Sequence, residues 1–80
     1  MNVEVRLHGS LTATRPGLRA GDPFGVELPP DSTVSALLQV VGLEPKDVHL
    51  VIVNGRIEHE RDAFLADRAR VGLFPPVGGG

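Results

Sequence analysis

The sequence has 80 residues, a length that forms a single domain burying only about 60% of its unfolded surface, so a deep enzyme cleft is not expected. Because cysteine is absent, disulfides, cysteine-ligated zinc, iron–sulfur clusters and thiol catalysis are excluded. A net charge of −2, the lack of Trp and Tyr, and the lack of a long apolar run argue against nucleic-acid and membrane partners and make the cytoplasm the expected location.

The first part of the chain predicts a β-hairpin. Residues 2–8 alternate apolar and polar side chains, the pattern of a strand that buries one face, and residues 24–28 repeat it. We expect these two strands to pair in antiparallel orientation. The intervening residues 9–22 are rich in turn formers and are predicted to form a long loop, with Leu11 and Leu18 tucked under the sheet edge.

A single helix is predicted to follow the hairpin. Residues 31–33, Asp-Ser-Thr, offer side chains that cap a helix N-terminus. Gly42 stands where a left-handed residue would end the helix, and Pro45 lies shortly beyond. Between these signals, the apolar residues fall on one helical face, namely Val34, Leu37, Leu38 and Val41.

The second half of the chain predicts further strands. Residues 48–53 are nearly all apolar and β-branched, as in a strand buried on much of both faces. Asn54-Gly55 is a strong signal for a two-residue hairpin turn. Residues 56–62 are expected to start as a short edge strand and continue as a solvated charged loop, which Phe64 and Leu65 anchor to the domain, and residues 71–74 are expected to form the last strand.

The order of these elements predicts an α+β domain. One helix among four or five strands suits a mixed sheet wrapped around that helix, and the β-grasp (ubiquitin-like) fold is the expected architecture. We place the β-grasp domain at residues 1–74 and a C-terminal tail at residues 75–80. The three histidines lack a metal-ligand spacing, so no metal site is predicted.

The tail reads Pro-Pro-Val-Gly-Gly-Gly. Pro75 and Pro76 cannot continue a helix or a central strand, and the glycines at 78–80 remove every Cβ from the approach to the terminal carboxylate. Six extended residues reach roughly 20 Å from the domain, which suits insertion into the active site of another protein. The alternative is an unstructured chain end without a function.

Two segments carry a family resemblance. Val53-Asn54-Gly55, followed by residues 71–79 with the sequence VGLFPPVGG, resembles the MoaD/ThiS family of ubiquitin-like sulfur carriers, particularly its MoaD-like branch, to which the small subunit of molybdopterin synthase belongs. This resemblance independently implies the β-grasp fold. One departure concerns residues 67–70, Asp-Arg-Ala-Arg, where many members carry an acidic Asp-Gly-Asp-type turn.

The resemblance implies a protein co-substrate rather than an enzyme. A MoeB/ThiF-like adenylating enzyme would consume ATP to convert the Gly80 carboxylate, next to Gly79, into an acyl-adenylate, and a sulfur donor would then produce a thiocarboxylate. An acceptor enzyme, such as the large subunit of molybdopterin synthase, would receive the sulfur within a hetero-oligomer. Since adenylation supplies the leaving group, the carrier needs no permanently bound cofactor or metal.

Several residues are candidates for binding these partners. If Leu50 and Ile52 face the helix, then Val51 and Val53 face away from it and form an apolar docking patch, unless the 9–22 loop covers them. Gly72 indicates either a bulge in the last strand or a close backbone approach. The other candidates are Arg68 and Arg70, which would meet acidic groups on a partner or remain solvated, and the tail with its root, namely Phe74, Pro75, Pro76, Val77 and Gly78.

The sequence leaves four functions open besides molybdopterin synthesis. A sulfur carrier of this kind also suits thiazole synthesis for thiamine or tRNA thiolation. A ubiquitin-like modifier would use the same adenylation but form an isopeptide bond, and Lys46 is the only internal lysine available for chain formation. The last alternative is a non-covalent interaction module with an inert tail.

Overall fold

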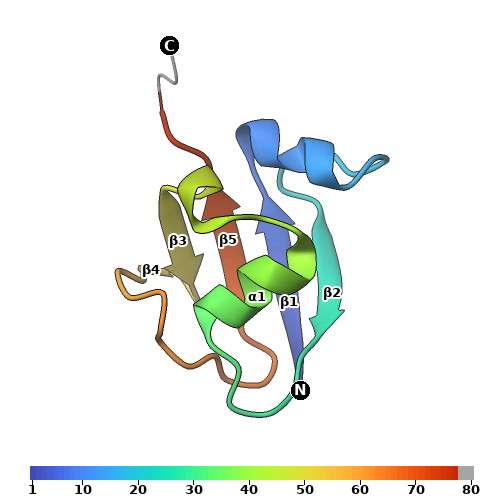
Figure 1. Cartoon of the computed structure of the whole chain (residues 1–80). Helices are drawn as coiled ribbons and strands as arrows, with labels where there is room; N and C mark the ends of the chain where they lie inside the picture. Colours follow the sequence, from blue (N-terminus) through green and yellow to red (C-terminus); the bar gives the residue numbers. More distant parts are fainter. Residues whose placement is uncertain (78–80) are drawn as a thin grey trace.

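The computed structural model describes residues 1–77, which form one mixed five-stranded sheet packed against one α-helix (Figure 1). The strand order is β2-β1-β5-β3-β4, in which β1 and β5 are parallel and the other neighbours are antiparallel. This architecture is the predicted β-grasp fold. The elements are β1 (Asn2–Leu7), η1 (a 3₁₀ helix, Gly9–Thr14), β2 (Pro23–Glu27), α1 (Val34–Val41), η2 (a 3₁₀ helix, Pro45–Asp47), β3 (Leu50–Val53), β4 (Arg56–Ile57) and β5 (Arg70–Phe74).

The helix α1 begins and ends where the sequence predicts. The Thr33 hydroxyl accepts a hydrogen bond from the Ala36 backbone N–H at 3.2 Å, as a capping side chain does. Gly42 ends the helix with φ of 92°, a left-handed conformation that costs glycine little. The predicted apolar face is buried against the sheet and comprises Val34, Leu37, Leu38 and Val41.

Both predicted hairpins are present. β1 and β2 pair in antiparallel orientation, with Val3 opposite Val26. Asn54 and Gly55 connect β3 to β4 with φ of 51° and 84°, and two consecutive positive φ values are typical of a type I′ turn. The Asn54 side chain also accepts a hydrogen bond from the Arg70 backbone N–H at 2.9 Å, so the turn is tied to the start of β5.

The predicted orientation of β3 is wrong. Val51 is completely buried, and Val53 packs against the core on the same side, so neither residue forms an exposed docking patch. The reason is the register with β5, which places Val51 opposite Leu73 and Val53 opposite Val71, two residues that face α1. Residues directly opposite each other in a sheet share a face. Val51 is therefore excluded from a partner surface by its burial.

The structure also differs from the sequence predictions in two loops. Part of the 9–22 segment forms η1 because Leu11 is buried in the core and the hydroxyls of Thr12 and Thr14 bond to backbone carbonyls three residues earlier, both at 2.9 Å. Leu65 is buried as expected, but Phe64 is 74% exposed and is not an anchor. A local pattern does not show which of two adjacent apolar residues is buried, because only one of them points toward the core.

Candidate functional site

One face of the sheet is left uncovered by α1, and we call it the open face. Alternation along each strand sends every second residue to this side. β3 contributes Leu50 and Ile52, which pair with Phe74 and Gly72 of β5, and β4 contributes Ile57, which is 54% exposed. These neighbours form an apolar strip across three strands. Such a strip is typical of a surface that binds another protein.

Gly72 forms the floor of a shallow hollow in the open face. The hollow has a volume of about 370 Å³. Gly72 is regularly paired with Arg6 on one side and Ile52 on the other, so its strand contains no bulge at this point. A Cβ here would lie 3.4 Å from the Phe74 ring, and the absent side chain therefore keeps the hollow open. The lining residues are Arg6, His8, Ile52, Gly55, Arg70, Val71, Gly72 and Phe74.

The Phe74 ring is fixed at one end of this hollow by His8. The two rings stack with centroids 4.1 Å apart and planes within 5° of parallel. The backbone around them is tied as well, because His8 N–H donates to the Leu73 carbonyl at 3.1 Å and His49 N–H donates to the Phe74 carbonyl at 2.9 Å. The last residue of β5 is therefore held on both sides. The chain continues from this fixed point into Pro75.

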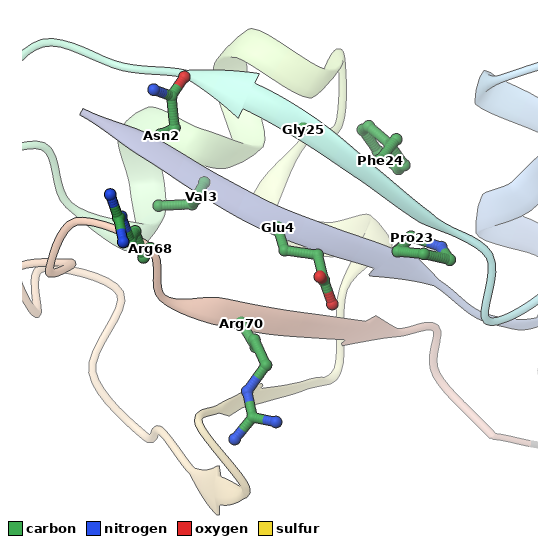
Figure 2. A pocket seen from close by; sticks show the side chains of 8 residues that line it. All are labelled: Asn2, Val3, Glu4, Pro23, Phe24, Gly25, Arg68 and Arg70. Atoms are coloured by element: carbon green, nitrogen blue, oxygen red, sulfur yellow. The ribbon is translucent and has the colours of Figure 1, made fainter.

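Arginines lie beside the apolar strip. Arg6 and Arg70 line the Gly72 hollow, and Arg68 and Arg70 line a neighbouring hollow of about 460 Å³. Figure 2 shows Arg68 at one end of this second hollow, with Glu4 and Arg70 on adjacent strands. Glu4 bonds to Arg6 at 3.1 Å, but both side chains are substantially exposed, so this pair contributes little to stability. Arg68 and Arg70 are exposed and have no salt-bridge partner among residues 1–77.

The structure brings some of the sequence-predicted residues together and separates others. Phe74 and Arg70 lie on the open face, with Arg68 at its end, whereas Val51 and Val53 lie on the opposite side of the sheet. Among the predicted tail residues, Pro75 is half-buried, Pro76 is exposed and Val77 is 92% exposed. Gly78, Gly79 and Gly80 lie outside the described residues.

Sequence reasoning missed two contributors to this site. The sequence shows only that His8 lacks a metal-ligand spacing, and the docking-patch hypothesis places Ile52 on the helix side. Both belong to the open face because β5 lies between β1 and β3, an arrangement that pairs segments far apart in the chain. The alternation of residues 2–8 does send His8 and Arg6 to the same side, and that signal was available.

Within residues 1–77, no three His, Asp or Glu side chains gather as metal ligands would. The same residues include no helix with the length and apolar character needed to cross a membrane. The charged segment after β4 is held by Arg61, whose guanidinium donates to the His49 carbonyl at 3.2 Å. This hydrogen bond ties the charged loop to the residue that precedes β3.

Comparison with protein-family models shows the family of the chain. The model of the ThiS family matches residues 19–80, which include the helix, the central strand β5 and the whole tail. The chain belongs to the ThiS family. Members of this family are small carriers that are not enzymes themselves. No curated protein matches the chain.

Solved structures support the fold. The chain is similar to small archaeal modifier protein 1 (SAMP1) from Haloferax volcanii, with a TM-score of 0.74 and 24% identity over 100% of both chains. It is also similar to a putative molybdopterin converting factor subunit 1 from Pyrococcus furiosus, with a TM-score of 0.73 and 23% identity over 96% of this chain and 99% of that one. A chain in a complex of subunits 1 and 2 of the molybdopterin-converting factor from Helicobacter pylori is also similar, with a TM-score of 0.61 and 26% identity over 100% of this chain and 100% of that one.

These likenesses establish a ThiS protein with the β-grasp fold. Membership of the ThiS family supports a small sulfur-carrier or ubiquitin-like protein.

Proposed function

We propose that this ThiS protein is a sulfur carrier whose Gly80 carboxylate is adenylated and converted to a thiocarboxylate, and that the sulfur is used in molybdopterin biosynthesis. The observation that carries the proposal is the continuity of β5 with the tail. β5 lies at the centre of the sheet, borders the open face and runs directly into Pro75 and Pro76. A partner docked on the open face therefore meets the tail where it leaves the domain.

The chemistry needs a carboxylate that is free of neighbouring side chains. A carboxylate oxygen of Gly80 attacks the α-phosphorus of ATP and releases pyrophosphate, a step that requires in-line approach inside the adenylating enzyme. Hydrosulfide then attacks the acyl carbon and displaces AMP, and loss of its proton leaves the thiocarboxylate. Because Gly78 and Gly79 lack Cβ atoms, they obstruct neither step. The adenylating enzyme consumes the ATP and supplies the catalytic groups.

The glycine tail carries an entropic cost that the domain helps to offset. Fixing each tail residue in the partner's active site costs roughly 1–2 kcal/mol of backbone entropy. Contacts made by the open face supply binding free energy that is independent of the tail. The apolar strip with Arg6 and Arg70 beside it fits a partner surface that presents apolar side chains next to Asp or Glu.

The names of similar proteins favour the molybdopterin pathway among the sulfur routes. Two of them are named as subunit 1 of a molybdopterin converting factor, and one of these was solved together with subunit 2. By analogy, we propose that this chain works as the small subunit of a hetero-oligomer, in which a larger subunit accepts the sulfur. Thiazole synthesis and tRNA thiolation remain alternative routes with the same carrier chemistry.

A second candidate function is a ubiquitin-like protein modifier. The likeness to a protein named as a small archaeal modifier favours it. Adenylation would be the same, but a lysine amine would displace AMP and form an isopeptide bond. The Lys46 side chain is 79% exposed, so it is accessible as an acceptor for a second copy.

Mass spectrometry of the protein isolated from its own cells tests the proposal. We expect an oxygen-to-sulfur mass increase confined to the C-terminal peptide that ends at Gly80. A variant that lacks both Gly79 and Gly80, grown in parallel, should lack the increase. Absence of sulfur under sulfur-replete conditions, with ATP and the adenylating enzyme present, would contradict the carrier function. Gly-Gly remnants on cellular lysines would instead support the modifier.

The pathway is tested separately by deleting the gene. Loss of molybdenum-enzyme activity, with thiamine synthesis and tRNA thiolation intact, supports molybdopterin synthesis. Loss of either of the other two products assigns the carrier to that route.

A further inference from the structure

We propose that Gly9 is a positioning residue for the C-terminal tail: its missing side chain lets the Pro75 ring lie against the start of η1, and this contact sets the direction in which the tail leaves the domain. The proposal rests on the proposed function insofar as that direction matters for adenylation. The contact itself is a property of the fold. Figure 1 shows η1 and the C-terminal end of β5 at the same end of the molecule.

The distances leave no room for a side chain at Gly9. A Cβ built there would lie 2.8 Å from Cγ and 3.2 Å from Cδ of Pro75. Carbon atoms in favourable contact are about 3.5–4.0 Å apart, so this approach is an overlap. The proline ring cannot swing away as a flexible side chain would, because the ring closes on its own backbone nitrogen. Relief therefore requires either η1 or the tail to move.

η1 is the more firmly held of the two. Leu11 is 4% exposed and belongs to the core, and its backbone N–H donates to the His8 carbonyl at 3.2 Å. His8 N–H is in turn bonded to the Leu73 carbonyl, which joins the start of η1 to β5. In contrast, Pro76 is exposed and Val77 is 92% exposed. A clash at Gly9 should therefore displace the tail.

The contact continues a pairing that begins one residue earlier. His8 stacks on Phe74, and the next residue, Gly9, contacts the next residue of the tail strand, Pro75. Pro76 extends the series by lining a hollow with Ser10 and other residues near η1. Since β1 and β5 are parallel, successive residues after each strand stay side by side. The segment after β1 thus guides the segment after β5.

The chain offers a matched control for this effect. Gly9 has φ of 56°, so an alanine there is strained by the backbone alone. Gly17 has φ of 96°, outside the left-handed region of about +50 to +70° that L residues tolerate, so an alanine there is strained at least as much by the backbone, but a Cβ there meets no atom within 4 Å. Both residues lie between β1 and β2. Comparing Gly9→Ala with Gly17→Ala therefore separates the Pro75 contact from the backbone strain.

The functional test uses ATP–pyrophosphate exchange catalysed by the adenylating enzyme from the same organism. We expect Gly9→Ala to lower kcat by about tenfold or more, because small misplacements of a reacting group carry large rate penalties. KM should change little, since the open face is intact. Gly17→Ala should stay near wild type. Pro75→Ala removes both clashing ring atoms, so kcat for the double variant Gly9→Ala/Pro75→Ala should exceed kcat for Gly9→Ala.

A distance measurement tests whether Gly9 sets the direction of the tail, independently of the adenylation reaction. The chain has no cysteine, so Val77→Cys and Val40→Cys create two unique spin-label positions, one on the tail and one on the exposed side of α1. We expect Gly9→Ala to shift or broaden the distance distribution between the labels, and Gly17→Ala to leave it unchanged. The unfolding midpoint of each variant confirms that it is folded.

The outcomes distinguish the inference from the proposed function. If wild type supports no exchange, the proposed function fails, while the label distances still decide whether Gly9 positions the tail. If wild type is active but Gly9→Ala and Gly17→Ala match in both exchange and distance, the inference is overturned. Loss of activity in the Gly9 variant that Pro75→Ala does not relieve would also overturn it.

Discussion

The two faces of the sheet are built from the same strands but differ in what covers them. The inner face is packed against α1 and consists of fully buried residues such as Val5, Val71 and Leu73. The open face alternates with it residue by residue, yet carries an apolar strip, a glycine-floored hollow and arginines. The inner face therefore determines stability, and the open face is available for a partner. Substitutions on the two faces should have different consequences.

The largest effect on stability is expected from the inner face. Leu37→Ala removes a side chain that is completely buried between α1 and the sheet, and the cavity should lower the free energy of unfolding by about 2–5 kcal/mol. Val40→Ala on the same helix is the control, because Val40 is 56% exposed and its loss should matter little. Urea unfolding measures both variants. Equal losses would contradict the assigned helix face.

A second effect is expected on binding through the open face. Gly72→Leu fills the hollow beside Phe74 and should weaken binding to the adenylating enzyme by at least tenfold, or about 1.4 kcal/mol. Gln39→Leu places the same side chain on the exposed side of α1 and is the control. Isothermal titration calorimetry measures the affinities. Unaltered binding of a folded Gly72→Leu protein would show that the partner docks elsewhere.

A charge reversal should have a smaller effect that depends on salt. Arg70→Glu places a negative charge beside the apolar strip, and an acidic partner should then associate roughly tenfold more slowly at low ionic strength. Arg19→Glu changes the net charge equally but lies in the segment between β1 and β2. Stopped-flow association at several salt concentrations provides the rates. A rate that is insensitive to Arg70→Glu would exclude an acidic partner surface.

The smallest effect is expected from the ion pair on the open face. Arg6 and Glu4 are exposed, so water and salt screen their attraction, and a double-mutant cycle with alanine should give a coupling of about 0–1 kcal/mol. Thermal or urea unfolding of the four proteins provides this value. A coupling well above that range would mean that the open face also contributes to stability, and the contrast between the faces would weaken.

Much of the fold was predictable because its signals are local. The Thr33 cap, the apolar face of α1, Gly42 and the Asn54-Gly55 turn depend on residues a few positions apart, and the structure confirms each of them. The β3 orientation was not predictable in this way. Its run of apolar residues has no alternation to mark an inner side, so the register with β5 decides that Val51 is buried.

The candidate site also combines features that local sequence predicts with features that strand pairing decides. By itself, the sequence determined the tail, from Pro75 and Pro76 to the three glycines, and it carries the family resemblance that implies the chemistry proposed at Gly80. Only the tertiary structure decided that His8 stacks on Phe74, that Gly9 contacts Pro75 and that Ile52 lies beside Gly72. The physical reason is that hydrogen-bonded pairing of β5 with β1 and β3 joins segments distant in the chain, and no local preference encodes which strands become neighbours.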